Sequence, residues 1–334
     1  MLKKFTILII TAIISLIDTS CFAQNKLTMS DQKNPLLCNP ESGICEVTPV
    51  LNEQNNITPA NQKSSKSIRI IYYTDPICSS CWGIEPQLRK LKLEYGALID
   101  IEYKMGGLLP DWSYNSGGIS KPSDVAHHWD EVSVYYDMPI DGDVWLEDPL
   151  SSSYPPSIAF KAAQMQDTQK ALAFLRLLRE AVFLQKKNIT KWEHLQAAAQ
   201  QAGLDVNQFK ADYEGKAKEN FQEDLDKAKE LGVRGFPTVF FINNENENTE
   251  KVYGSKPYSS FEQAIQKLQN NVVKNSYNKD WEHIFKAYPT STAREYAELA
   301  EMPRAESEAL LNKLTAQGKL SKFSTKNGAI WTLK

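Results

Sequence analysis

The sequence has little net charge, and it lacks an apolar run long enough to cross a membrane. Its 334 residues carry 38 Lys and Arg against 41 Asp and Glu, so the formal net charge is −3 and no overall basic field points to nucleic acid. The apolar run at 5–17 is shorter than the roughly 20 residues that a spanning helix needs. We therefore expect no nucleic-acid partner and no membrane span in the mature chain.

The first 23 residues have the pattern of a secretory signal. A positively charged start and the apolar run precede the small residue Ala23, which stands at the expected cleavage point. An uncleaved membrane anchor and a lipid anchor on Cys21 are the alternatives. The pattern predicts export to the periplasm or cell envelope of a bacterium, with a mature chain that begins at Gln24.

Cysteines are few and fall into two close-spaced pairs. Cleavage after residue 23 leaves Cys38 with Cys45 and Cys78 with Cys81, an even number that suits an oxidising compartment. The first pair is either a small stabilising loop or a second redox pair that passes electrons to the other. A zinc site needs four ligands at characteristic spacings, and the spacings within these two cysteine pairs do not match each other. We expect no metal, nucleotide or flavin cofactor.

Periodicity predicts an α/β fold. The β-branched and aromatic run 68–73, a helix from about 78 to 95 and the alternating run 99–105 form a right-handed βαβ unit. A helical insertion over about 106–232 follows, then strands at 238–242 and 251–253 and a last helix. Together these elements predict one domain over 67–275, preceded by a flexible tether at 24–66 that carries the first cysteine pair.

The tail at 288–334 predicts two helices and a terminal hairpin, an order that resembles a winged-helix module. Its charges of both signs make a weak footprint for phosphate binding, and export would remove DNA as a ligand. We expect a protein contact for this module, and a homodimer is left open.

Cys78 and Cys81 lie where a strand gives way to a helix. Two intervening residues on a first helical turn bring the two sulfurs within bonding distance. Free amides and the helix dipole stabilise a thiolate at Cys78, which is the predicted nucleophile, and Cys81 resolves the mixed disulfide. A purely structural bridge is the alternative. Glu85 shares the helix face of Cys81 and is either a proton relay or a solvent-facing side chain.

A second motif precedes the third strand, and it makes the resemblance specific. With Val233-Arg234-Gly235-Phe236-Pro237-Thr238, the chain resembles the DsbA-like branch of the thioredoxin superfamily, and within it the FrnE-like dithiol oxidoreductases. The resemblance implies a thioredoxin fold with a helical insertion, in which Pro237 is cis beside the cysteines. It also implies that the backbone of Phe236 pairs with substrate and that Pro86 kinks the active-site helix.

One departure from the family pattern concerns the residues between the cysteines. Strongly oxidising members have Cys-Pro-His-Cys, whereas Ser79 and Ser80 stand here, so the resemblance implies a less oxidising couple. It implies thiol–disulfide exchange, as an oxidase or isomerase, on exported proteins, with protein thiols and disulfides as substrates and an unidentified redox recycling partner. The alternative is a redox-sensing adaptor, because intracellular relatives of this branch bind a regulator and deliver it to a protease. Such an adaptor would have no reason for an export signal.

Overall fold

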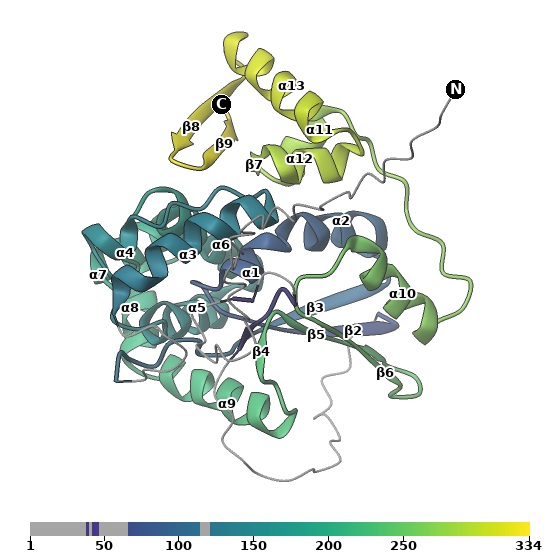
Figure 1. The fold of residues 1–334 in the computed structure, drawn as a ribbon. Helices are drawn as coiled ribbons and strands as arrows, with labels where there is room; N and C mark the ends of the chain where they lie inside the picture. The colour runs from purple at the N-terminus through teal and green to yellow at the C-terminus, as the bar shows by residue number, and fades with distance from the viewer. Residues whose placement is uncertain (1–37, 40–41, 47–65, 114–120) are drawn as a thin grey trace, which may run out of the picture. The chain divides into compact units, whose positions relative to one another are not determined.

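The computed structural model describes residues 38–39, 42–46, 66–113 and 121–334, and the predicted signal segment lies outside them. A four-stranded sheet of order β3-β2-β5-β6 forms its centre (Figure 1). The strands are β2 (Ile68–Thr74), β3 (Ile99–Met105), β5 (Thr238–Asn243) and β6 (Thr249–Tyr253). β2 pairs in parallel with β3 and antiparallel with β5, and every residue of β2 is buried, as its β-branched and aromatic composition predicts.

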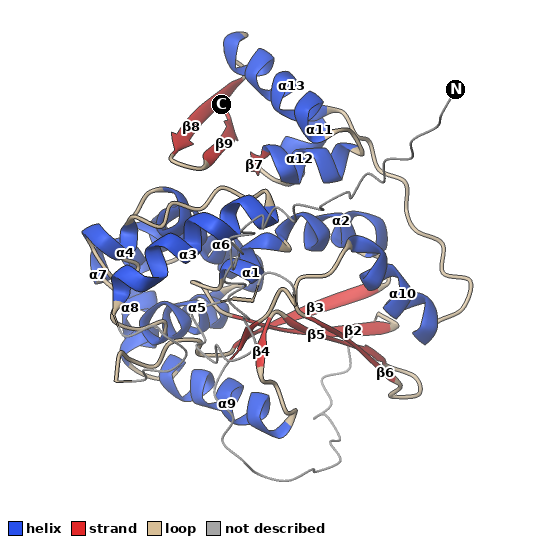
Figure 2. Cartoon of the chain, in the orientation of Figure 1, coloured by secondary structure: helices blue, strands red, loops and turns tan. Residues whose placement is uncertain are grey.

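The helix predicted over 78–95 is two helices. α1 (Ser79–Gly83) ends before Ile84, and α2 (Glu85–Tyr95) begins with Pro86 in its first turn. Pro86 has no N–H to donate to the carbonyl of residue 82, so a continuous helix would lose a hydrogen bond there. α10 (Tyr258–Leu268) packs against both α2 and the sheet. Figure 2 shows α2 and α10 on the same side of the sheet.

The helical insertion is richer in helix than the periodicity predicts. Its helices are α3 (Pro122–Tyr136), α4 (Val144–Glu147), α5 (Tyr154–Gln166), α6 (Thr168–Leu184), α7 (Trp192–Gln201), α8 (Val206–Glu214) and α9 (Ala217–Glu230). Their aromatic side chains join the core, where the ring of Phe183 lies 5.6 Å from that of Trp82 and 4.8 Å from that of Trp129. The insertion therefore packs directly against α1.

The C-terminal module contains α11 (Trp281–Ala287), β7 (Thr290–Thr292), α12 (Ala293–Ala300), α13 (Arg304–Ala316), β8 (Leu320–Thr325) and β9 (Gly328–Leu333). Its strands form a sheet of order β7-β9-β8, and its buried side chains make a second hydrophobic cluster around Phe285, Tyr296 and Trp331. The sequence predicts its last two helices and its hairpin, whereas α11 and β7 are additions. β7 is three residues long, too short to show a periodicity.

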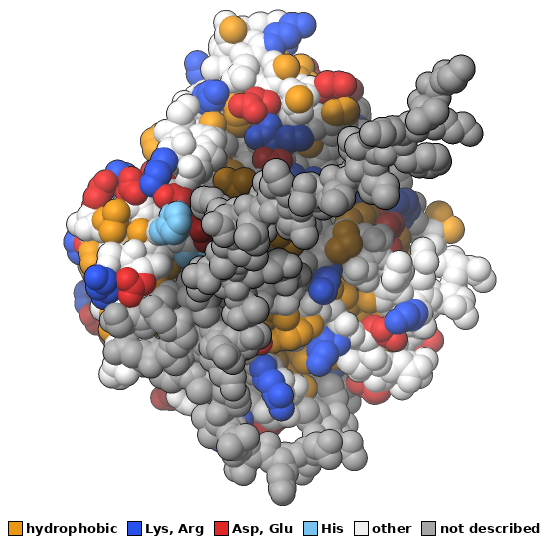
Figure 3. Space-filling model, viewed as in Figure 1, with side chains coloured by type: hydrophobic (Ala, Val, Ile, Leu, Met, Phe, Trp, Pro, Cys, Tyr) orange, Lys and Arg blue, Asp and Glu red, His pale blue; other side chains and the backbone are white. Residues whose placement is uncertain are grey.

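Two further findings bear on partners. Within the described residues, no helix combines the length and the apolar character needed to cross a bilayer. On the face drawn in Figure 3, the basic and acidic side chains are interspersed, and neither sign gathers into one broad patch. This mixture accords with the small net charge of the chain.

Candidate thiol site at the end of the sheet

The two cysteines of the CxxC motif stand at the start of α1, just beyond the end of β2. Cys78 is the N-cap residue of α1, and its Sγ accepts a hydrogen bond from the backbone N–H of Cys81 at 3.1 Å. Both are free thiols and both are fully buried. The strand therefore carries the chain to the site, and the first turn of the helix brings the two side chains together.

The chain's own N-terminal segment covers this site. Cys38 and Cys45 form a disulfide, and β1 (Cys45–Glu46) pairs antiparallel with β4 (Gly235–Phe236), with Cys45 opposite Phe236. The Phe236–Pro237 bond is cis. The backbone that the resemblance assigns to substrate is thus occupied from within the chain. The segment predicted as a flexible tether is, where the structure describes it, held against the domain.

Close backbone contacts hold the segment in place. Ser255 donates its backbone N–H to the carbonyl of Gly43 at 2.7 Å and so ties the segment to the domain, whereas within the segment Asn39 donates to the carbonyl of Ile44 at 2.8 Å. A Cβ on Gly235 would fall 2.6 Å from the carbonyl oxygen of Cys45 and 2.6 Å from the Ile44 side chain. Only glycine at 235 lets the two strands approach this closely.

Sulfur atoms from both pairs meet at the site. The Sγ of Cys45 lies 3.3 Å from the Sγ of Cys78, and the hydroxyl of Ser79 donates to the Sγ of Cys38 at 3.0 Å. The sulfurs of Cys38, Cys45 and Cys78 lie within 4.8 Å of one another, a spacing that a soft metal ion could bridge if all three were thiolates. As a disulfide, Cys38 and Cys45 cannot act as thiolate ligands, so the arrangement suits thiol–disulfide chemistry.

The electrostatics of the CxxC pair favour negative charge on its second cysteine. Burial raises the pKa of Cys78, and the neighbouring Cys81 adds to this. Burial opposes ionisation of Cys81 too, but hydrogen bonding from Cys78 and the positive charge of Arg179 lower the pKa of Cys81 overall. The helix N-terminus alone predicts a thiolate at Cys78, whereas the hydrogen bond between the two cysteines and the positive charge of Arg179 together favour the negative charge on Cys81.

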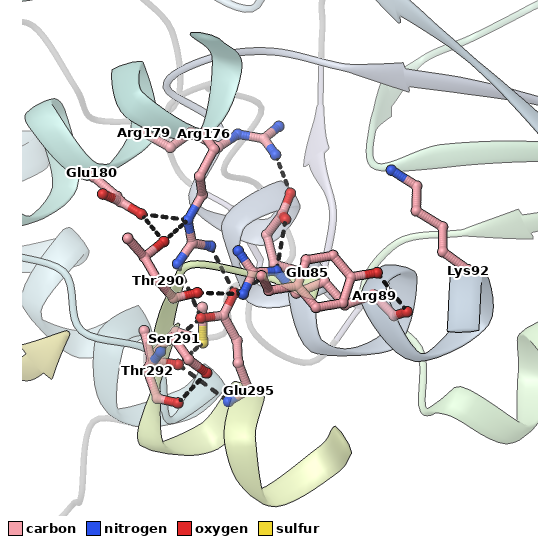
Figure 4. Close-up of polar contacts among 12 residues, drawn as sticks. Glu85, Arg89, Lys92, Arg176, Arg179, Glu180, Thr290, Ser291, Thr292 and Glu295 are labelled. Atoms are coloured by element: carbon pink, nitrogen blue, oxygen red, sulfur yellow. Dashed lines mark hydrogen bonds and ion pairs between the residues drawn. The ribbon is translucent and has the colours of Figure 1, made fainter. Parts of the chain in front are cut away.

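Glu85 is not a solvent-facing side chain, and its role as a proton relay stays a prediction. Its side chain is 14% exposed, and its carboxylate forms an ion pair with Arg179, which also donates to the hydroxyl of Thr74 at 2.6 Å (Figure 4). Sequence reasoning missed Arg179 because it is far along the chain, on α6. One signal was available, since Arg179 stands between the buried residues Leu178 and Val182 of that helix.

The charged network continues from Glu85 to the C-terminal module (Figure 4). Glu295, fully buried on α12, accepts from the guanidinium of Arg176 at 2.6 and 3.0 Å and lies 3.3 Å from Arg89. Arg89 also donates to the carbonyl of Thr290 at 2.7 Å. The network contains three arginines and three glutamates that balance one another, and it reaches the cysteines through Arg179: Arg89, Arg176, Arg179, Glu85, Glu180 and Glu295.

Asp75 is a buried carboxyl next to the thiol pair. It accepts hydrogen bonds from the backbone N–H of Ile77 at 3.0 Å, from that of Leu108 at 2.8 Å and from the Ser153 hydroxyl at 2.8 Å. Burial raises the pKa of Asp75 to about 6, although these bonds oppose the rise. The pre-proline turn explains the position of Asp75 in the sequence but not this burial.

The raised pKa of Asp75 predicts a pH dependence of stability. The folded chain holds the proton of Asp75 up to about pH 6, whereas the unfolded chain releases it near 3.8. Its contribution to stability is therefore full below pH 3.8 and is lost as the pH rises to about 6, a loss of about 3 kcal/mol. Urea unfolding from pH 4 to 7 should show this loss in the unaltered chain relative to Asp75→Asn. Parallel curves for the two chains would contradict the assignment.

Comparison with known proteins places this geometry in a family. A family model described as Thioredoxin matches residues 72–263. A putative protein disulfide isomerase from Nitrosomonas europaea shares the fold, with a TM-score of 0.54, 19% identity and coverage of 62% of this chain and 100% of that one. The predicted thioredoxin fold is confirmed.

Two relatives match beyond that domain. The ClpXP adapter protein SpxH of Halalkalibacterium halodurans is 38% identical over 308 residues, which cover 91% of this chain and 99% of the relative. The chain belongs to the SpxH family. The SpxH protein of Shouchella clausii is 34% identical over 296 residues, 88% of this chain and 95% of its own. The unaligned 9% in the first comparison is shorter than the C-terminal module, so the match to SpxH includes that module at least in part.

This finding corrects the function expected from the CxxC motif. The prediction of an oxidoreductase that acts on exported proteins is wrong, because the relatives that match most of the chain are named as adapters. The DsbA-like resemblance holds at the level of the fold, and no FrnE-like assignment follows from it. The thioredoxin fold and the two cysteine pairs still give the SpxH-family chain the groups needed for thiol chemistry.

Proposed function

We propose that this SpxH-family chain is an adaptor that binds a protein partner and presents it to the ClpXP protease. The observation that carries the proposal is the 38% identity to a ClpXP adapter over 91% of this chain and 99% of the relative. The site geometry supports it, because the thiol pair is buried and the adjoining strand edge is already paired with the chain's own segment. An enzyme acting on many substrates would need that edge open.

Reconstitution with purified components tests the proposal. Proteolytically inactive ClpP from the source bacterium would capture partners with and without the chain, and each dependent partner would then be offered to active ClpXP. We expect the full chain to speed degradation of at least one partner tenfold or more. We expect Cys78→Ser/Cys81→Ser to retain this activity, because presenting a partner requires binding and no disulfide exchange. Degradation of every captured partner at the same rate with and without the chain would contradict the proposal.

The location of the chain provides an independent test. An adaptor must share a compartment with the protease, whereas the pattern of residues 1–23 predicts export. Cells producing the full chain would be fractionated and the intact mass of the protein measured. The adaptor proposal expects a cytosolic chain that retains these residues. A chain that begins at Gln24 and is confined to the exported fraction would contradict it.

A further inference from the structure

The segment that covers the CxxC motif is arranged as a reactant. Cys45 lies in β1, opposite Phe236 of β4, and its sulfur is already joined to Cys38. The Sγ of Cys78 stands 3.3 Å away, within the separation of about 3–3.5 Å that reacting atoms have before bond formation. A disulfide that only stabilised the N-terminal segment would not need to lie next to a free thiol.

We propose that the Cys38–Cys45 disulfide is an internal substrate of the Cys78–Cys81 pair, so that the chain transfers one disulfide between two positions within itself. This activity does not depend on the adaptor function, since both reactants belong to the chain. It needs no outside oxidant or reductant. It also explains why the segment pairs with β4, the strand that ends at the cis peptide bond.

The first step forms a mixed disulfide. The thiol of Cys78 passes its proton to the thiolate of Cys81, and the Cys78 sulfur attacks the Sγ of Cys45. The Cys38–Cys45 bond breaks as the Cys45–Cys78 bond forms, and Cys38 leaves as a thiolate. The Ser79 hydroxyl, 3.0 Å from the Cys38 sulfur, is placed to donate a hydrogen bond to this leaving group.

The second step completes the transfer. The thiol of Cys81 gives its proton to the thiolate of Cys38, and the Cys81 sulfur attacks that of Cys78. The Cys45–Cys78 bond breaks, and Cys45 leaves as a thiolate. The product has a Cys78–Cys81 disulfide and a reduced Cys38 and Cys45 with one proton between them. Two electrons have passed from the CxxC pair to the N-terminal pair, and the count of protons is unchanged.

The structure also indicates which sulfur is attacked. Cys45 is fixed by backbone pairing in β1 and faces Cys78, whereas the sulfur of Cys38 faces Ser79. Attack at Cys45 therefore starts from two sulfurs that are 3.3 Å apart, and the group that departs already has a hydrogen-bond donor. The proposal predicts a mixed disulfide on Cys45, with Cys38 released.

Removal of the resolving cysteine should trap that intermediate. Trypsin places Cys38 and Cys45 together in peptide 34–63 and Cys78 and Cys81 together in peptide 70–89. The full chain with Cys81→Ala, incubated at pH 8 with a chelator, acid-quenched and alkylated, should yield these two peptides joined by a disulfide. Cleavage at Glu41, which separates Cys38 from Cys45, should then show Cys38 alkylated and Cys45 cross-linked.

A matched control keeps every reacting sulfur but prevents docking. Gly43 has φ +67°, and a Cβ at this position would fall 2.5 Å from the backbone N and the Cβ of Ser255. Gly43→Val/Cys81→Ala should therefore yield at least tenfold less cross-linked peptide than Cys81→Ala. Equal yields, or an intact Cys38–Cys45 disulfide with alkylated Cys78 in both chains, would overturn the proposal.

A second measurement leaves all the cysteines in place. Unaltered chain with one disulfide is prepared by two routes, from the oxidised chain with one equivalent of reductant and from the reduced chain with one equivalent of oxidant. Internal exchange should bring both samples to the same ratio of oxidised peptide 34–63 to oxidised peptide 70–89. A ratio that keeps its dependence on the route for hours would show that the two pairs do not exchange, and it would overturn the proposal.

Discussion

A chain with Glu295→Gln is expected to lose about 3–5 kcal/mol of its free energy of unfolding, because the change leaves buried positive charge without its partner. The Glu295 carboxylate is fully buried and contacts both Arg176 and Arg89. It also accepts from the backbone N–H of Thr292 at 2.7 Å, which completes the cap of α12. The glutamine keeps the volume but removes the charge, so one guanidinium of the balanced network is left in excess.

Urea unfolding at pH 7 of the unaltered and substituted chains measures this loss. Glu298→Gln is the matched control, since it makes the same change on the same helix at a side chain that is 16% exposed and pairs with Arg294 at 3.2 Å. We expect a loss of about 1 kcal/mol or less there. Burial alone would raise the pKa of Glu295, but the two arginines lower it overall, so the effect of Glu295→Gln should shrink below pH 4.5. Equal losses for the two variants would refute the role assigned to the network.

The second large effect is expected from Arg179→Met on the ionisation of the cysteine pair. Arg179 is 1% exposed, and its positive charge is one of the causes that lower the pKa of Cys81. An opposite charge at such short range lowers a pKa by about 1–3 units, so its removal should raise the apparent pKa of the pair by about that amount. At any pH well below the apparent pKa of the unaltered pair, the thiolate fraction would fall about tenfold or more.

Thiolate absorbance near 240 nm, followed against pH, measures this change in a reduced chain whose other cysteines, at 21, 38 and 45, are serine. Arg179→Lys is the control, because it keeps a positive charge but lacks the forked donors that reach both Glu85 and Thr74. We expect a smaller rise in pKa for lysine than for methionine. An unchanged titration in the methionine variant would mean that Arg179 does not set the ionisation of the pair.

Local features of the site can be predicted from the sequence because their causes are local. The run 68–73 is buried on both faces and forms β2, and the CxxC motif begins the helix that follows. The peptide bond before Pro237 is cis, as the family resemblance implies. Each of these depends on residues within a few positions of one another, which periodicity and motif spacing record.

Contacts between distant parts of the chain could not be predicted in this way. Glu295 meets Arg176 across 119 positions, and β1 meets β4 across about 190, and no local pattern carries either pairing. The expected oxidoreductase was wrong for a related reason. A CxxC motif records the chemistry available to a fold, whereas the adaptor alternative gains its support from similarity along most of the chain, including at least part of the module beyond the thioredoxin domain.

The pairing of β1 with β4 also sets a condition on any outside strand that would use the same edge. Such a strand competes with β1, which is part of the same chain. It can therefore bind only those molecules in which β1 has separated from β4. If about one molecule in a hundred is open, the apparent dissociation constant of the competitor rises about hundredfold. A chain that lacks residues 38–46 would therefore bind the outside strand at β4 with a higher affinity than the whole protein does.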